Sequence, residues 1–196
     1  MPERSWATGW EALDAVEGGL PQNAVTELCC TPGCGGFFLE RVLESIREQR
    51  SLAGLIDSGR TFDPDSYEAS VFPRVLHVFC ETAEQSVKVA DLLLRDGNLP
   101  LVLLDLQATS RRGLGSIPAS TWHRFQRLVE RSGAALVVMT PQPIVEAARM
   151  RITLRGRWPL AAQKRPRAEL RREIEVQVFR RGKQGVPPRE AQARIA

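Results

Sequence analysis

The sequence contains no long apolar run and no export signal. No segment approaches the roughly 18 to 20 consecutive apolar residues that a helix needs to cross a bilayer. The N-terminus, MPERSWATGWEALD, also lacks the basic stretch followed by an apolar one that marks a secretory signal. We therefore expect a cytoplasmic protein with no membrane segment, in a compartment that keeps thiols reduced.

Histidine and cysteine are scarce, which argues against a bound metal. The chain has 2 histidines and 4 cysteines, and the spacing matches no standard zinc pattern. We expect Cys29, Cys30, Cys34 and Cys80 to be small buried apolar residues. The alternative is a metal or redox site in which Cys30 and Cys34 join Cys80, or His77 on the same predicted strand. Our expectation is no metal and no cofactor.

Positive charge is concentrated at the C-terminal end. Residues 1–140 carry 13 Lys and Arg against 18 Asp and Glu, whereas residues 141–196 carry 14 against 5. The C-terminal part thus has a net charge of +9 within a chain of +4. Such a concentration attracts polyanions or acidic protein surfaces. The alternative is a solvated and partly disordered basic tail.

Short apolar segments alternate with longer segments of helical period, which is typical of an α/β protein with a mainly parallel sheet covered by helices. The predicted strands are nearly continuous in apolar character, as expected for strands buried on both faces. They are Val25–Cys29, Ala53–Asp57, Val75–Phe79, Leu101–Asp105 and Ala135–Met139. The predicted helices are Gly36–Arg50, Ala83–Arg95 and Pro118–Arg131. Thr82 and Gln85 form a capping-box pattern at the start of the second helix.

The pattern changes after the fifth predicted strand. Met150–Leu154 and Glu173–Phe179 are predicted to be antiparallel strands at the sheet edge, because apolar and polar residues alternate in the second of them. Residues 155–170 contain prolines and several basic residues, so we predict a mobile loop there. Residues 184–196 are predicted to be a flexible tail. The chain is therefore expected to be one core domain, residues 1–183, followed by that tail.

The segment from Val25 to Leu39 has the order of a phosphate loop, namely a strand, a glycine-rich turn and a helix. A working loop has the pattern G-x-x-x-x-G-K-[ST], in which the lysine neutralises phosphate charge and the hydroxyl binds Mg²⁺. In that register Cys30 takes the place of the first glycine, Gly35 keeps the second, Gly36 replaces the lysine and Phe37 replaces the hydroxyl residue.

Several segments in the same order resemble the RecA recombinase family over roughly residues 6–183. They are Thr8–Asp14, Gly18–Pro21, Val25–Leu39, Leu55–Pro64, Thr82–Gln85 and Leu101–Asp105. The resemblance implies a RecA-like core, in which Asp105 is the vestigial Walker B aspartate and Gln142 stands where the family has its nucleotide-sensing glutamine. The glutamate that orients the attacking water falls at Gly59.

These departures imply a protein that is not an enzyme, since the groups that bind phosphate and activate water are missing. Phe37 and Phe38 are expected to fill the space that a nucleotide once needed, by packing the helix onto the sheet. Gln142 lies between Pro141 and Pro143, so we expect it to be part of the loop structure rather than a sensor.

Two ATP-less branches of the family remain open. The chain resembles the ImuA group, small accessory proteins of SOS mutagenesis that are thought to support translesion synthesis by bridging a Y-family polymerase-like partner (ImuB), the RecA recombinase and DNA. The second branch is represented by SulA, a division inhibitor that binds FtsZ. Two further alternatives are a residual nucleotide-binding RecA paralogue and a purely structural subunit. The hairpin ending in Val178–Lys183, which is similar to a DNA-facing segment of recombinases, and the basic C-terminal part favour the ImuA group.

The basic residues of that C-terminal part are the predicted binding site. We expect Arg180, Arg181 and Lys183, together with Arg171 and Arg172, to contact DNA phosphate or an acidic partner surface. The guanidinium group suits both targets because it bonds phosphate or carboxylate in a bidentate manner.

Overall fold

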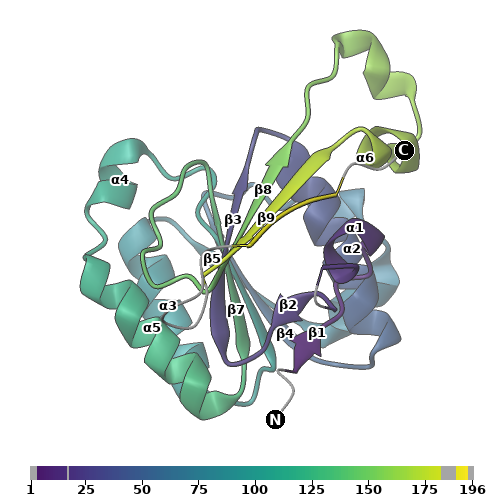
Figure 1. The fold of residues 1–196 in the computed structure, drawn as a ribbon. Helices are drawn as coiled ribbons and strands as arrows, with labels where there is room; N and C mark the ends of the chain where they lie inside the picture. The colour runs from purple at the N-terminus through teal and green to yellow at the C-terminus, as the bar shows by residue number, and fades with distance from the viewer. Residues whose placement is uncertain (1–3, 17, 182–188, 194–196) are drawn as a thin grey trace.

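The five predicted buried strands form the centre of one sheet (Figure 1). They are β3 (Ala24–Cys30), β4 (Ala53–Ser58), β5 (Val75–Cys80), β6 (Leu101–Asp105) and β7 (Ala135–Thr140). They pair in parallel in the order β3-β7-β6-β4-β5. The computed structural model describes residues 4–16, 18–181 and 189–193, and the predicted α/β class with a mostly parallel sheet is confirmed.

Helices and short elements connect these strands. The helices are α1 (Glu11–Asp14), α2 (Cys34–Glu48), α3 (Ala83–Asp96), α4 (Arg111–Gly115), α5 (Ala119–Ser132) and α6 (Arg167–Arg172), with 3-10 turns η1 (Pro64–Ser66), η2 (Ala69–Arg74) and η3 (Leu160–Lys164). A separate antiparallel pair consists of β1 (Ser5–Trp6) and β2 (Leu20–Pro21). None of the described helices is long and apolar enough to cross a membrane.

The sheet has a hydrophobic core on each face, because successive strand residues point to opposite sides. Leu101 and Leu103 of β6 contribute to the core under α1, α2 and α6, while Val102 and Leu104 contribute to the core under α3, α4 and α5. Figure 1 shows the two groups of helices on opposite sides of the sheet. The predicted cap of α3 is present, with the amide N–H of Gln85 donating to Thr82 Oγ1 at 3.2 Å.

The prediction of burial on both faces is wrong for β5. This strand is the last of the parallel strands and forms an edge of the sheet, so only one neighbour covers it. Leu76 is 48% exposed and His77 is also exposed. Apolar composition alone did not distinguish an edge strand from a central one, because position in the sheet is set by the order of pairing.

The predicted antiparallel C-terminal edge is present, with one correction. β8 (Met150–Arg155) pairs antiparallel with β9 (Glu175–Arg180), but its other neighbour is β3, to which it is parallel. Residues 141–149 therefore cross the whole height of the sheet between β7 and β8. The tail prediction is also wrong in part, because β10 (Arg189–Ala193) continues the sheet by pairing antiparallel with β9.

The segment 155–170, predicted to be a loop, contains η3 and the first turn of α6. Pro159 and Pro166 stand at the N-caps of these two elements, where a proline removes no intrahelical hydrogen bond. The segment is also attached to the phosphate-loop region, since Gly156 N donates to Thr31 Oγ1 at 3.1 Å. Proline therefore starts helices here rather than preventing them.

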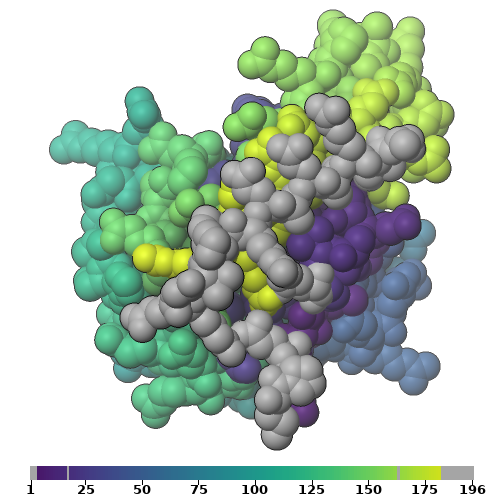
Figure 2. Space-filling model, viewed as in Figure 1, coloured from purple at the N-terminus to yellow at the C-terminus, as the bar shows by residue number. Residues whose placement is uncertain are grey.

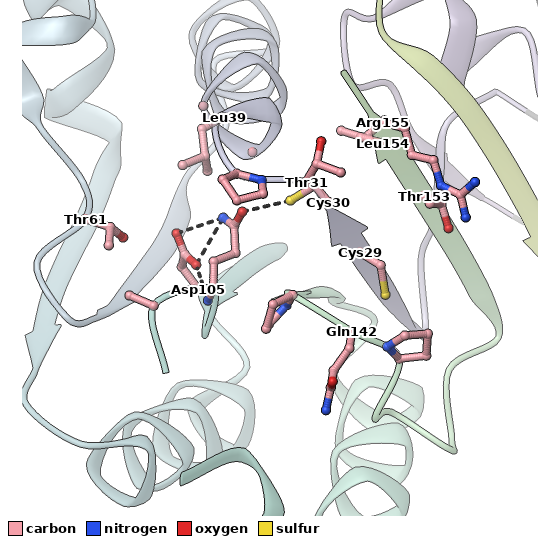
Figure 3. A pocket seen from close by; sticks show the side chains of 18 of the residues that line it. Cys29, Cys30, Thr31, Leu39, Thr61, Asp105, Gln142, Thr153, Leu154 and Arg155 are labelled. Carbon is pink, nitrogen blue, oxygen red and sulfur yellow. Dashed lines mark hydrogen bonds between the residues drawn. The ribbon is translucent and has the colours of Figure 1, made fainter. Parts of the chain in front are cut away.

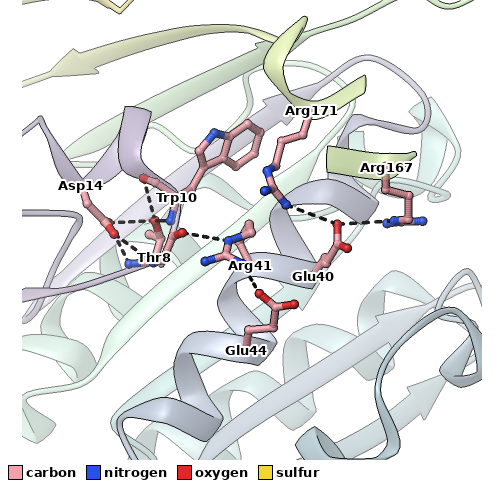
Figure 4. Close-up of polar contacts among 9 residues, drawn as sticks. Thr8, Trp10, Asp14, Glu40, Arg41, Glu44, Arg167 and Arg171 are labelled. Carbon is pink, nitrogen blue, oxygen red and sulfur yellow. Dashed lines mark hydrogen bonds and ion pairs between the residues drawn. The ribbon is translucent and has the colours of Figure 1, made fainter. Parts of the chain in front are cut away.

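The N-terminal turn, residues 8–14, is held by a single carboxylate. Asp14 accepts hydrogen bonds from Thr8 N at 2.8 Å, from Thr8 Oγ1 at 2.8 Å and from Gly9 N at 2.9 Å (Figure 4). The turn is fastened to α2, because Arg41 Nε donates to Gly9 O at 2.8 Å. This explains the spacing of threonine, glycine and aspartate in the segment: it forms a local turn that covers α2.

Candidate functional site

A cavity of about 690 Å³ lies at the carboxyl ends of β3, β6 and β7. Ligands of open α/β sheets bind at this end of the strands. Its lining includes Cys29, Cys30, Thr31, Gly35, Gly36, Tyr67, Asp105, Gln107, Gln142, Thr153 and Arg155 (Figure 3). The cavity therefore brings together the glycine-rich turn after β3 and the carboxyl end of β6.

The side chain of Gln107 connects these two segments. Its Oε1 accepts a hydrogen bond from the Cys30 thiol at 2.8 Å. Its Nε2 donates to both carboxylate oxygens of Asp105, at 3.2 and 3.3 Å. Figure 3 draws these hydrogen bonds as dashed lines that end at Cys30 and at Asp105. The loop after β3 and the end of β6 are thus joined by one neutral side chain.

Gly35 is the reason why this side chain fits. A Cβ added at Gly35 would come within 2.5 Å of both Gln107 Nε2 and Gln107 Oε1. The second glycine of the phosphate-loop pattern, Gly35, thus stands where the side-chain amide of Gln107 lies against the main chain.

Asp105 is a buried carboxyl group with an unusual affinity for protons. It is 4% exposed, and burial raises its pKa from 3.8 to about 6, against the opposing effect of hydrogen bonds from Gln107. Asp57, beside it on β4, adds to the increase by charge repulsion. The carboxylates of both residues are occupied by donors of the chain, because Asp57 accepts from Thr61 N at 3.1 Å and from Phe62 N at 3.2 Å.

The thiols of Cys29 and Cys30, which line the cavity, and of Cys34 beside them in the loop and helix that follow β3 are poor nucleophiles. Burial raises the pKa of Cys29, Cys30 and Cys34 above the ordinary thiol value. The thiolate is the reactive form, so these groups stay protonated and inert near neutral pH.

A joint site for Cys30, Cys34 and Cys80 is excluded by the strand order. β3 and β5 are separated by β7, β6 and β4, so Cys30 and Cys80 lie about 19 Å apart across the sheet. His77 is on β5 as well, where its Nε2 lies 3.8 Å from Asp57 Oδ2. Among the described residues no group of three or more His, Cys, Asp or Glu is arranged to hold a metal ion.

Phe37 and Phe38 are both buried and pack α2 onto its neighbours, but Phe37 does not fill the cavity. Its ring lies 5.4 Å from that of Trp158 and 4.9 Å under the guanidinium of Arg167. The expectation that this side chain closes the nucleotide space is therefore wrong, because the ring points toward the 156–172 segment. Arg167 also donates to the carbonyl of Gly36 at 3.3 Å, next to the position of the missing lysine.

Gly59, where the resemblance stated above would put a catalytic glutamate, has a backbone that disfavours any side chain. Its φ is +118°, and an added Cβ would come within 3.1 Å of Ala108 Cβ. Residues with a Cβ rarely adopt this conformation. Gln142 borders the cavity, but it points away from Asp105 and accepts from Arg111 Nη2 at 3.4 Å (Figure 3).

The predicted basic residues are divided between two ends of β9. Arg171 and Arg172 precede the strand, and Arg171 Nη1 lies 3.8 Å from Glu40 Oε2 on α2 (Figure 4). Arg180 and Arg181 end it, about 20 Å away given the strand length. Lys183 is outside the described residues. The four described arginines therefore do not form one binding surface.

Sequence reasoning missed three residues at these sites. Gln107 gave no signal, because a glutamine after a strand is an ordinary loop residue. Arg155 belonged to the predicted loop, yet it ends β8 and lines the cavity. Arg149 lines a second hollow together with Arg180 and Arg181, and only the crossing of residues 141–149 brings it there.

The comparisons with known proteins add no relative. No family model matches the chain, and no curated protein matches it. The geometry defines an α/β protein with a mostly parallel sheet. In the cavity at the carboxyl ends of its strands, Gln107 hydrogen-bonds to both Cys30 and Asp105.

Proposed function

We propose that this chain is a RecA-like protein without ATP chemistry that acts as an accessory factor in the SOS response. In this role it supports translesion synthesis by bridging a Y-family polymerase-like partner similar to ImuB, the RecA recombinase and DNA. The protein acts by binding its partners, and it has no catalytic residues.

The observation that carries the proposal is the Gln107 side chain in the phosphate-loop region. The amide lies against Gly35, accepts a hydrogen bond from the Cys30 thiol and donates one to Asp105. In a phosphate loop those places serve the phosphates and their metal ion. With Gly36 in place of the lysine, no ammonium group neutralises a triphosphate there.

The architecture supports the RecA-like part of the proposal. The sheet combines parallel strands with an antiparallel C-terminal edge, as the sequence pattern predicts, and this arrangement is compatible with a RecA-like core. The turn at residues 8–14 has a structural role that explains its motif without any ligand, because Asp14 accepts three hydrogen bonds within it and Arg41 fastens it to α2. A scaffold with these features and no phosphate chemistry is suited to presenting surfaces to other molecules.

The test is affinity purification from cells in which the DNA has been damaged. Recovery of a Y-family polymerase-like protein together with RecA is expected. Recovery of FtsZ without either of them would favour a division inhibitor and overturn the proposal. Calorimetric titration with ATP and Mg²⁺ tests the proposed loss of ATP chemistry. A dissociation constant for ATP below about 1 mM would contradict it.

A further inference from the structure

The outward face of α5 is mostly basic. Thr121, Trp122, Phe125 and Val129 are buried, so the opposite side of the helix faces solvent. At 100° per residue that side carries the following residues: Ser120, His123, Arg124, Arg127 and Arg131. The acidic residue of the helix, Glu130, lies at the border of this face, where Gln126 Nε2 donates to it at 2.9 Å.

The other two long helices differ from α5. On α3 the charges alternate, and Glu84 pairs with Lys88 in the same helix. On α2 the outward residues Arg41 and Glu44 form a pair within the helix. Arg127 and Arg131, in contrast, make no ion pair with any residue that the structure describes, and both are exposed. Their charges are available to a ligand.

A basic hollow adjoins one flank of this face. Its described lining holds His123 of α5 with four arginines against one carboxylate, Glu146, and the arginines are Arg149, Arg151, Arg180 and Arg181. Arg151 is already paired with the buried Glu27 at 2.7 Å. Figure 2 shows yellow atoms from the end of β9 reaching the green surface on the α5 side.

A second hollow adjoins the other flank, between the C-terminal ends of α3 and α5. Four arginines line it, namely Arg95, Arg124, Arg127 and Arg131. Arg95 and Arg124 share Asp91 as their ion-pair partner, whereas Arg127 and Arg131 lie one helical turn apart and extend the positive face. His123 and Arg127 are also one turn apart, so α5 connects the two hollows.

The chemistry of this face fits a nucleic acid better than an acidic protein. Protein interfaces have a buried apolar or aromatic centre, while interfaces with nucleic acid are polar and strongly positive. The large apolar side chains that the described part of the chain exposes are Leu52, Leu76, Leu92 and Leu160, and none lies on α5. The basic hollow includes the half-buried ring of Phe179, but the outward face of α5 itself presents arginine and histidine without a large exposed apolar side chain.

We propose that the outward face of α5, with the hollow formed by Arg149, Arg180 and Arg181, binds the phosphate backbone of a nucleic acid. We call this surface the α5 strip. Recognition is independent of base sequence, because the contacting groups are guanidinium and imidazole groups that face phosphates. The proposed function already includes DNA as a partner, and the strip adds the surface that binds it; the strip itself requires neither a RecA relationship nor a polymerase partner.

The test uses a fluorescent poly-thymidine strand and measures its anisotropy with the full chain over a range of salt concentrations. Arg127→Glu combined with Arg131→Glu is expected to weaken binding about tenfold or more and to reduce the salt slope by about two. The alanine pair at the same positions is expected to give a smaller loss in the same direction. Thermal unfolding checks that each variant is folded.

The matched control is Arg47→Glu, compared with Arg131→Glu alone. Both arginines are exposed and lie in the last turn of a long helix, so the changes in charge and in helix-dipole interaction are the same. Only the change on α5 is expected to weaken binding.

The proposal would be contradicted if Arg47→Glu and Arg131→Glu reduced the affinity for the strand equally. It would also be contradicted if the wild-type protein did not bind the strand at low salt. Binding of an acidic protein through Arg127 and Arg131, with no binding of the strand, would assign the face to a protein partner and would also overturn it. The two proposals can fail separately. If the variants lose DNA binding but affinity purification recovers no SOS partner, the α5 strip is supported and the proposed SOS function is contradicted.

Discussion

The amide of Gln107 lies where a side chain at Gly35 would be: a Cβ there would come within 2.5 Å of its nitrogen and its oxygen. The amide also joins Cys30 to Asp105 through hydrogen bonds of 2.8 and 3.2 Å. The glycine is therefore needed for an interaction within the chain.

Gly35→Ala is expected to lower the free energy of unfolding by about 1–2 kcal/mol, because the methyl group displaces the Gln107 amide and breaks its hydrogen bonds. In a Gln107→Ala background the same change is expected to cost much less. Urea unfolding of the four proteins measures this coupling. The control is Gly115→Ala, where an added Cβ meets nothing within 4 Å. Equal costs in both backgrounds would show that the two residues are not coupled.

Asp105→Asn is expected to stabilise the protein at pH 7. The native pKa of about 6 exceeds the ordinary 3.8, so the native state holds this proton to higher pH than the unfolded chain does. This group's contribution is therefore fully present below about pH 4 and is lost as pH rises from about 4 to about 6. Removal of the charge is expected to gain about 2 kcal/mol at pH 7 and little at pH 4. Urea unfolding at both pH values measures it, and a variant less stable than wild type at pH 7 contradicts the prediction.

Phe37→Thr, which brings back the hydroxyl of a phosphate loop, is expected to destabilise the fold by about 3 kcal/mol. The ring is buried and contacts Trp158 and Arg167, and threonine replaces none of this contact area. Thermal or urea unfolding is the measurement. Leu92→Ala serves as the control, since that side chain is 66% exposed and its loss is expected to cost about 0.5 kcal/mol or less. Similar costs for the two changes would mean that Phe37 is not part of the core.

Asp14→Ala is expected to loosen the N-terminal turn and to cost about 2 kcal/mol, because three donors lose one carboxylate. Amide hydrogen exchange is the sharper measurement, and the N–H groups of Thr8 and Gly9 are expected to exchange faster. Asp63→Ala removes a carboxylate from the exposed cap of η1 and is expected to cost less. Unchanged exchange at Thr8 would show that the turn is held by other contacts.

Much of the core was predictable because its elements are marked by local patterns. β6 has its predicted bounds, Leu101–Asp105, and α3 begins at the predicted Ala83 after its Thr82 cap. Elements with weak local signals were missed: α4 is five residues long, and β10 lies in a segment with no apolar period. Pairing to β9 forms β10, and pairing is not visible in one segment alone.

Local sequence patterns specify the alternation of buried strands and amphipathic helices. The residues at positions 36, 37 and 59 show directly that the lysine, the hydroxyl and the carboxylate of the phosphate-loop chemistry are absent there. Which side chains occupy that region depends on the packing of the sheet. The position of Gln107 against Gly35, the separation of Arg171 from Arg180, and the meeting of Arg149 with α5 all depend on the strand order. These contacts join residues far apart in the chain, so no local period or composition encodes them, and the packing of the sheet sets them.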